Sequence, residues 1–485
     1  MPNKLRSLQI FGWLLDVRLW IFALFLIRLE TINLPPLDEH NLRQTLTLTA
    51  ARNMIEISPN PLKPMLSAGR GSCPDPVAME PGIYTGLIAV SYKIFGEHYW
   101  NSRLINLIVS SAGLWFFYAF LTRFWPRPAA LASTILFGVS ITFIYARKSM
   151  PDTFALSFVL MGNYYGAKYL NKSRWSDLSG FVLTMSTGLL VKLPMACAAM
   201  LLLWPFVQSG SSRAARLRLV VAACVPLSLM ALWYFWWTPK LIHDGALRMY
   251  ETYGFVEGWR QFWALREGVW DNFTRVQMGS YWPFALLLPG IYALGRRHQE
   301  RATLAIFGSA AVFAVFIIQA AYAYPTHEYY GIPFNPAYAM IAGFGLSYLF
   351  EKWPVLLFSC LLAISIVSIR HQKNDFFVRP EARKFLQLGP MADSVSLQSD
   401  KFLVNDAVYT RMLYFLHRQG RSEGSDLFKK YPEWVYDYGR EGIKFICTDR
   451  AGLPDSLNYP IVAETPDFRI YRHTWSPENP LTTPR

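Results

Sequence analysis

The sequence predicts a mainly α-helical, polytopic membrane protein with a small α/β domain at its C-terminus. Three observations support this fold class. Of the 485 residues, 53% are hydrophobic and only 16% are charged, whereas about 25% of an average soluble protein is charged. The charges are uneven, because 31 of the 80 lie in residues 371–485. The first 370 residues also contain repeated apolar runs of the length, about 20 residues, that crosses a bilayer.

We therefore expect about eleven transmembrane helices, with a range of 11–13. The runs lie at 10–29, 101–121, 129–146, 152–170, 179–194, 195–208, 218–238, 281–295, 302–322, 331–350 and 354–370. Segment 82–96 is apolar but short, which also suits a helix along the membrane interface. The composition excludes a disordered chain, a disulfide scaffold and an ordinary cytosolic enzyme.

The basic residues predict the orientation of these spans. The net charge is +14, and 16 basic and 15 acidic residues in 371–485 account for only +1 of it. The other basic residues gather in short loops between apolar runs, which is typical of cytoplasmic loops rather than of a nucleic-acid site. We therefore expect a cytoplasmic N-terminus, extracytoplasmic loops at 31–100, 239–280 and 323–330, and a multi-pass protein of the bacterial plasma (inner) membrane, surrounded by membrane lipids.

Two domains are expected: a transmembrane catalytic domain over 1–370 and an extracytoplasmic α/β domain over 371–485. In the second domain, apolar alternation predicts strands at 401–406 and 443–448, helices at 407–419 and 431–441, and a hairpin at 459–472 about Asp467. This domain contains no catalytic motif that we can identify.

The chain lacks the motifs that bind activated nucleotides. It has no G-x-x-x-x-G-K-[ST] and no G-x-G-x-x-G, and His327-Glu328-Tyr329-Tyr330-Gly331 lacks the second His of a zinc protease. Group transfer on the outer face must then use a donor that arrives already activated. A lipid-linked donor fits a protein embedded in the membrane.

The richest polar stretch lies directly after the first span, at residues 34–53. Pro35 and Pro36 stop the preceding helix. In one interpretation Asp38 or Asn41 caps the next helix, and Glu39 pairs with Arg43. In the other, adjacent carboxylates beside apolar surface have raised proton affinity, which suits a general base, while Arg43 and Arg52 supply positive charge for a phosphate.

This ordered set of motifs resembles the GT-C membrane glycosyltransferases, and within them the dolichyl-phosphate-mannose–protein mannosyltransferases and the lipid A aminoarabinose transferases. The resemblance covers roughly residues 10–350. The matching segments are Asp38-Glu39, Arg43-Gln44 through Arg52-Asn53, Glu80-Pro81-Gly82-Ile83-Tyr84, Phe95-Gly96 with Arg103, Tyr145-Ala146-Arg147, Pro151-Asp152, and His327 with Tyr329 and Tyr330. Two features depart from the aminoarabinose transferases: Pro81 stands where they have a Lys, and Asp38 and Arg43 are further apart.

The resemblance implies transfer of a sugar from a polyprenyl-phosphate donor to a hydroxyl acceptor on the extracytoplasmic face, with inversion. Asp38 is expected to be the catalytic base, with Glu39 as the alternative. The donor phosphate is assigned to Arg43, Arg103, Arg147 and Lys148. Residues expected to line the cavity are Gln44, Arg52, Glu80, Tyr84, Asp152, His327 and Tyr330. The acceptor stays open among a glycan, a lipid and a protein.

Several of these residues also have plain structural interpretations. Arg147 and Lys148 would reach lipid headgroups from the end of a span, and Asp152 would cap the following helix. No cofactor is assigned, although Asp38, Glu80, Asp152 and His327 are ligand types that suit a divalent cation. Two other functions stay open for the whole chain: a lipid-linked-sugar transporter or flippase, and a non-catalytic envelope-polymer assembly protein.

Overall fold

The computed structural model describes residues 16–69, 74–208, 210–249, 252–407 and 410–475. Its internal contacts divide the described chain into two compact units. The helical unit comprises the described parts of residues 1–33, 103–237 and 250–376. The mixed unit comprises those of residues 34–102, 238–249 and 377–485, so the first predicted outer loop clusters with the C-terminal segment.

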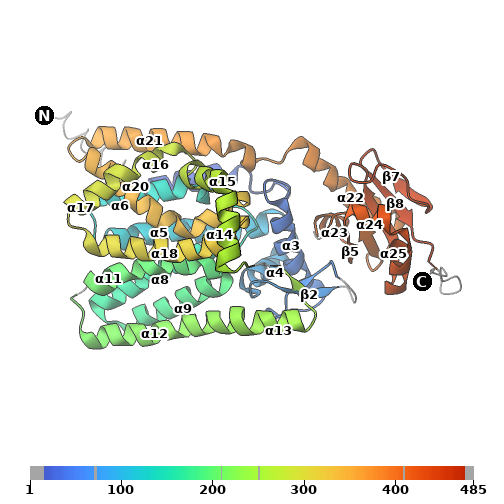
Figure 1. The fold of residues 1–485 in the computed structure, drawn as a ribbon, viewed down its shortest axis with the longest axis horizontal. Helices are drawn as coiled ribbons and strands as arrows, with labels where there is room; N and C mark the ends of the chain where they lie inside the picture. The colour runs from blue at the N-terminus through green and yellow to red at the C-terminus, as the bar shows by residue number, and fades with distance from the viewer. Residues whose placement is uncertain (1–15, 70–73, 209, 250–251, 408–409, 476–485) are drawn as a thin grey trace. The chain divides into compact units, whose positions relative to one another are not determined.

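The helical unit is built from apolar helices, several of which run alongside one another (Figure 1). They are α2 Val17–Leu29, α5 Trp100–Leu121, α6 Arg127–Val139, α7 Thr142–Tyr145, α8 Asp152–Lys172, α9 Trp175–Val191, α10 Ala196–Ala199, α11 Leu203–Gln208, α12 Arg213–Ala231, α14 Phe255–Ala264, α15 Arg266–Asp271, α16 Tyr281–Ala285, α17 Leu287–Arg296, α18 Glu300–Ala320, α19 Ala323–Thr326, α20 Asn335–Leu349 and α21 Pro354–His371. Short 3-10 or π turns lie at Leu193–Met195, Met200–Leu202, Leu232–Trp237, Asn272–Val276, Glu328–Phe334 and Lys373–Phe376.

Each of the eleven expected runs contains helix, but the number of spans is not confirmed. Among the described residues, four helices are long and apolar enough to cross a membrane: Trp100–Leu121, Arg213–His243, Glu300–Ala320 and Pro354–His371. Helices Arg127–Val139 and Leu193–Gln208 are apolar but shorter. Large apolar side chains such as Leu217, Val221 and Phe235 are exposed along α12 and its continuation, which is expected of a surface that faces lipid.

Two expected spans are interrupted by identifiable local chemistry. The run at 129–146 breaks after Val139, because the Ser140 hydroxyl donates to Phe137 O at 2.7 Å and Thr142 Oγ1 donates to the same carbonyl. Such hydroxyl–backbone bonds compete with the helical ladder. The run at 179–194 ends at Val191, and Lys192 adopts an extended conformation ahead of Pro194.

Close helix packing depends on glycine at two crossings. A Cβ at Gly188 in α9 would lie 2.6 Å from Val159 Cγ2 of α8, and a Cβ at Gly343 in α20 would collide with the Ser133 backbone of α6. Small residues let the backbones of membrane helices approach one another in this way.

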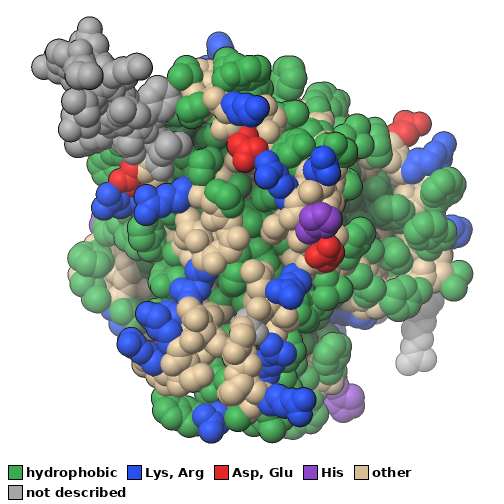
Figure 2. Space-filling model, turned by 90° about the vertical axis from the view of Figure 1, so that its left-hand side faces the viewer, with side chains coloured by type: hydrophobic (Ala, Val, Ile, Leu, Met, Phe, Trp, Pro, Cys, Tyr) green, Lys and Arg blue, Asp and Glu red, His purple; other side chains and the backbone are tan. Residues whose placement is uncertain are grey.

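One end of the helical unit is strongly basic. Figure 2 shows many Lys and Arg side chains and few acidic ones on the face where α17 ends and α12 begins. The predicted cytoplasmic loops supply exposed basic residues there, including Arg213, Arg296, Arg297 and Lys352. This charge pattern supports the predicted orientation, which itself stays a prediction.

The mixed unit contains a five-stranded sheet of order β5-β4-β6-β8-β7. Strand β4 is parallel to β5 and β6, whereas β8 is antiparallel to β6 and β7. The strands are β4 Lys401–Val404, β5 Gly420–Ser422, β6 Ile443–Asp449, β7 Ile461–Glu464 and β8 Phe468–Arg472. The helices nearby in the chain are η7 Pro380–Gln387, α22 Leu388–Val395, α23 Arg411–Leu416, α24 Ser425–Lys430, α25 Pro432–Asp437 and η8 Tyr438–Glu441. The expected strands and hairpin are confirmed, while β5, η7, α22 and α24 were missed.

The rest of the mixed unit comes from the first loop and from residues 238–249. Helix α3 Asn41–Glu56 packs on α4 Ile83–Phe95, and β1 Met65–Leu66, β2 Asp75–Ala78 and β3 Leu247–Arg248 form a small second sheet. α13 Thr238–His243 precedes β3. The first loop and the C-terminal segment join through backbone bonds from Gly69 N to Gly420 O and from Gly420 N to Ser67 O.

Candidate functional site

The acidic motif sits at a strained turn ahead of α3. His40, the residue before the helix, adopts a left-handed backbone conformation with φ 58° and gives no side-chain cap. Left-handed conformations are costly for residues other than glycine, and such strain concentrates at functional sites. The helix begins at Asn41, so Asp38 is not its N-cap. The interpretation of Asp38 as a simple helix cap is therefore wrong.

Asp38 and Arg43 each have a specific partner. Gln44 Nε2 donates to Asp38 Oδ1 at 2.5 Å, and Asp38 is only 2% exposed. Arg43 Nη2 lies 2.5 Å from Glu80 Oε1, and Glu80 is also buried. The Arg43–Glu80 pair joins α3 to the turn before α4. Because the pair is buried, removing either partner would leave an uncompensated charge, which is strongly destabilising. Four residues predicted from sequence therefore come together here.

A hollow of about 850 Å³ opens beside the acidic motif. Asp38, Glu39 and Asn41 form one part of its wall, and residues 379–387 with Arg411, Asp449 and Asp467 form the rest. Arg379 Nη2 reaches Glu39 Oε2 at 3.4 Å across it. Asp38 is therefore a buried carboxylate in the wall of a cavity, and ionisable groups in such settings are candidates for a functional site.

Arg52 and Tyr84 make contacts that hold the mixed unit together. Arg52 pairs with Glu97 at 2.5 Å, donates from Nη1 to Tyr414 O at 3.0 Å, and lies 4.4 Å from the centre of the Tyr414 ring. Burial opposes its charge, but the Glu97 carboxylate outweighs burial and raises the pKa of Arg52. Tyr84 OH donates to Ser102 O. The cavity role expected for both residues stays a prediction.

We expect Arg52→Met to destabilise the protein by about 3 kcal/mol, because it leaves the Glu97 carboxylate without its guanidinium and removes the contact with Tyr414. The unfolding temperature of the purified protein measures this. Arg18→Met is the matched control: Arg18 also pairs at 2.5 Å, with Asp16, but its side chain is 74% exposed. The control should unfold like the wild type, and equal losses in both variants would contradict the argument.

A second link should make stability depend on pH. His417 Nε2 lies 2.9 Å from Glu56 Oε1. Burial raises the pKa of Glu56, but the hydrogen bond with His417 and the charges of His417 and Arg52 together outweigh burial and hold that pKa below its ordinary value. A lowered carboxyl pKa contributes stability above the unfolded pKa of about 4.3 and loses it as pH falls. Glu56→Gln should thus be less stable than wild type at pH values above about 4.3, and the difference in unfolding temperature should shrink as the pH falls below that value.

In the helical unit, the Tyr145–Met150 turn is clamped by Asn106 of α5. Asn106 Nδ2 donates to Tyr145 O and Lys148 O, each at 2.9 Å, and its Oδ1 accepts from Thr153 at 3.0 Å. Sequence analysis missed Asn106, although an amide inside an apolar run was the available signal. The clamp fixes Arg147 and Lys148, which are both fully buried.

Arg147 belongs to a stack in which two aromatic rings lie between two cations. Arg28 lies 4.7 Å from the Phe143 ring, Phe143 stacks on Phe376 at 5.4 Å, and Arg147 lies 4.1 Å from Phe376. Arg28 also donates to Phe143 O and Gly138 O, and Arg147 to Phe376 O. Cation–ring contacts strengthen when they are desolvated. Arg28 was missed because it sits inside the first apolar run.

Buried charge in the helical unit is unbalanced. Among its described residues, five cationic side chains are buried, Arg28, Arg103, Arg147, Lys148 and Lys192, against two carboxylates, Asp152 and Asp177. Asp177 pairs with Lys168 and Asp152 with Lys192. An excess of positive charge away from water favours the binding of an anion.

The aromatic loop motif packs onto the same turn. Tyr329 lies 5.7 Å from Tyr145 between ring centres, and His327 contacts both Tyr329 and Tyr330. Burial lowers the pKa of His327, which favours the neutral imidazole at pH 7. Among the described residues, no three His, Cys, Asp or Glu side chains lie so that they could hold a metal ion.

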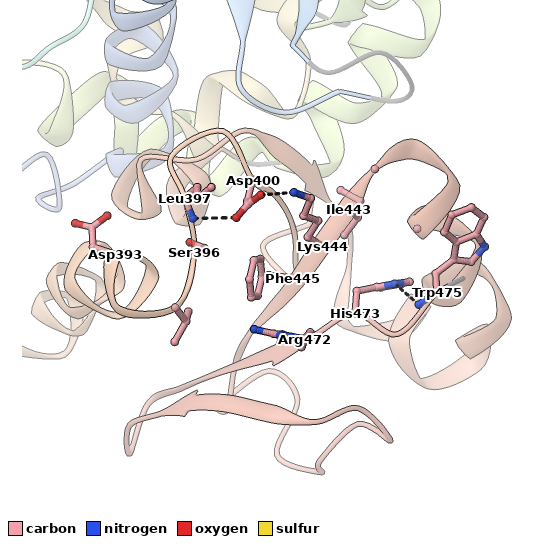
Figure 3. A pocket seen from close by; sticks show the side chains of 13 residues that line it. Asp393, Ser396, Leu397, Asp400, Ile443, Lys444, Phe445, Arg472, His473 and Trp475 are labelled. Carbon is pink, nitrogen blue, oxygen red and sulfur yellow. Dashed lines mark hydrogen bonds and ion pairs between the residues drawn. The ribbon is translucent and has the colours of Figure 1, made fainter. Parts of the chain in front are cut away.

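A second hollow, of about 700 Å³, lies in the C-terminal part of the mixed unit. Figure 3 shows Phe445 and Arg472 inside it, with Trp475 and His473 at one side. Asp400 accepts from Lys444 Nζ at 2.7 Å and from Leu397 N at 2.9 Å, and Trp475 N donates to His473. No residue predicted from the motifs lines this hollow.

The long apolar helices define a class, that of multi-pass membrane proteins. Residues 80–237 match the family model of the dolichyl-phosphate-mannose-protein mannosyltransferases. The resemblance proposed from sequence is thereby confirmed. Sequence comparison with curated proteins gives no significant match.

Solved structures support the same fold. ArnT from Cupriavidus metallidurans in the apo state superposes with a TM-score of 0.66 at 12% identity, covering 96% of this chain and 98% of that one. The same protein bound to undecaprenyl phosphate gives 0.64, with the same identity and coverage. The Archaeoglobus fulgidus oligosaccharyltransferase gives 0.54 at 12% identity, covering 90% of this chain and 68% of that one. The chain therefore has the fold of these membrane glycosyltransferases.

Proposed function

We propose that this chain is a membrane glycosyltransferase that moves a sugar from a polyprenyl-phosphate donor to an acceptor hydroxyl. The observation that carries the proposal is Asp38, a buried carboxylate in the wall of an 850 Å³ hollow. The match to the mannosyltransferase family model and the similarity in fold to ArnT, whose structure has been solved with bound undecaprenyl phosphate, support the donor class.

The proposed step is a single displacement. The acceptor oxygen attacks the anomeric carbon and forms the new glycosidic bond, while the bond from that carbon to the donor phosphate oxygen breaks. Asp38 takes the acceptor proton, with Glu39 as the alternative base, and the anomeric centre inverts. The products are the glycosylated acceptor and polyprenyl phosphate. A departing phosphate monoester has a second pKa of about 6, so it needs no strong acid.

The departing phosphate needs positive charge. Arg43, Arg103, Arg147 and Lys148 are the proposed donors of that charge, and the excess of buried cations in the helical unit supports the last three. Arg28 is added because it lies in the same stack as Arg147. Gln44 positions Asp38 through its 2.5 Å hydrogen bond.

The structure weakens one alternative function. A non-catalytic assembly protein was expected to use the acidic pair only as a helix cap, but His40 occupies the cap position. The proposed location is the inner membrane with the acidic loop outside. Cysteine accessibility at loops 31–100 and 323–330 tests this: labelling of intact cells by an impermeant reagent is expected, and labelling only after lysis would contradict it.

The function is tested with the full-length protein in proteoliposomes. A radiolabelled polyprenyl-phosphate sugar and cell-envelope acceptors should give labelled product and stoichiometric polyprenyl phosphate. The product anomer, determined by NMR, should be opposite to that of the donor. Failure to consume the polyprenyl-phosphate sugars tested, in an otherwise folded preparation, would refute the proposal.

A further inference from the structure

The hollow beside Asp38 is completed by the C-terminal segment. Asp38, Glu39 and Asn41 come from the first loop, whereas Arg379, Lys384, Gln387, Arg411, Asp449 and Asp467 come from the segment after residue 376. Arg411 connects the two parts: it donates to Asp406 at 2.7 Å and to Asn41 Oδ1 at 3.5 Å. Its guanidinium also lies 4.1 Å from the centre of the Phe385 ring.

The charges around this hollow nearly balance. Four basic side chains and five carboxylates line it. Several are already bonded to one another: Lys384 donates to both Asp449 oxygens at 2.7 and 2.8 Å, Gln387 donates to Asp467 at 3.1 Å, and Arg379 reaches Glu39. The hollow therefore offers both hydrogen-bond donors and acceptors, and its lining carries no net positive charge.

This chemistry discriminates among acceptor classes. The five carboxylates outnumber the four basic side chains, so an acidic acceptor would gain no net electrostatic attraction from this hollow. A lipid chain needs an apolar lining, but Leu37 and Phe385, the largest apolar side chains in the wall, are buried beneath it. A neutral sugar presents many hydroxyls that both donate and accept, and paired carboxylates and cations satisfy both needs.

We propose that this hollow binds a neutral, hydroxyl-rich glycan as the acceptor, and that Lys384 and Gln387 of the C-terminal segment help to select it. The inference rests on the proposed function for the transfer step, but glycan binding can be measured without transfer. Lys384, held by Asp449, is a specificity-determining residue whose third Nζ hydrogen is directed to a sugar oxygen.

The test uses full-length protein in nanodiscs and a panel of soluble probes: neutral oligosaccharides of hexoses, pentoses and N-acetylhexosamines, their sulfated counterparts, and Ser/Thr-rich peptides. Lys384→Gln should weaken neutral-oligosaccharide binding roughly tenfold, since hydrogen bonds to a charged group are lost. Lys444→Gln is the matched control, because Lys444 forms the equivalent 2.7 Å pair with Asp400 in the second hollow. It should bind the probes like wild type.

Each outcome decides the inference. Neutral binding that is weakened by Lys384→Gln and kept by Lys444→Gln supports it. The inference is overturned if the protein binds only sulfated probes or peptides, or if it binds no probe at all. It is also overturned if Lys444→Gln, and not Lys384→Gln, weakens the binding of neutral oligosaccharides. Glycan binding without consumption of any polyprenyl-phosphate sugar would refute only the proposed function. If sugar transfer occurs and Lys384→Gln has the same acceptor KM as the wild type, only the inference would be refuted.

Discussion

Asp38→Asn is expected to reduce kcat for sugar transfer by about 10³-fold, within the range that general base catalysis contributes. The amide keeps the size of the carboxyl and can still contact Gln44, which lies 2.5 Å away. It cannot accept the proton of the acceptor hydroxyl. Donor KM should change little, because Asp38 is not assigned to the donor phosphate. Steady-state kinetics with a radiolabelled polyprenyl-phosphate sugar measure both constants.

The neighbouring carboxylate supplies the control. Glu39→Gln removes a charge from the same turn, but Glu39 is partly exposed and faces Arg379. We expect a loss of kcat of less than about tenfold, since Glu39 affects the proton acceptor only indirectly. The reverse order of the two effects would make Glu39 the base. Unchanged kcat in Asp38→Asn, with a normal unfolding temperature, would remove Asp38 from the mechanism.

The sequence predicted individual strands and helices better than the hydrogen bonds that interrupt them. The strands at 401–404 and 443–449 follow from alternating apolar residues, and the hairpin follows from Asp467 between two apolar runs. The break after Val139 could not be predicted from hydropathy, because it depends on hydroxyl bonds from Ser140 and Thr142 to one carbonyl. Hydropathy measures how apolar a segment is and contains no information about hydrogen bonds from side chains to the backbone.

The candidate site likewise has one part that the sequence predicted and one part that it did not. Asp38 and Arg43 stand out in sequence because carboxylates and guanidiniums follow two prolines in a polar loop. Their partners Gln44 and Glu80 were identified only as general cavity residues. The second wall of the hollow, at residues 379–387 and 411, lies more than 300 positions away and carries no motif. Its role depends on tertiary contacts such as that between Arg411 and Asn41, which no local pattern records.

Arg147→Met is expected to raise donor KM at least tenfold and to lower the unfolding temperature. The methionine fills similar space but removes the charge that a donor phosphate would meet, which is worth about 1.5–3 kcal/mol. It also ends the contact with the Phe376 ring at 4.1 Å and the hydrogen bond to Phe376 O. Donor titrations of initial rate and thermal unfolding in nanodiscs measure the two effects.

Phe376→Leu separates binding from packing. It removes the ring that stacks on Phe143 and faces Arg147, but it keeps the backbone carbonyl to which Arg147 donates. We expect it to lower the unfolding temperature and leave donor KM within about twofold of wild type, because the cation stays in place. Arg147→Lys keeps the charge and should recover part of the donor affinity. If donor KM instead follows the unfolding temperature across all three variants, Arg147 acts through packing alone, and the donor phosphate must be bound by other cations.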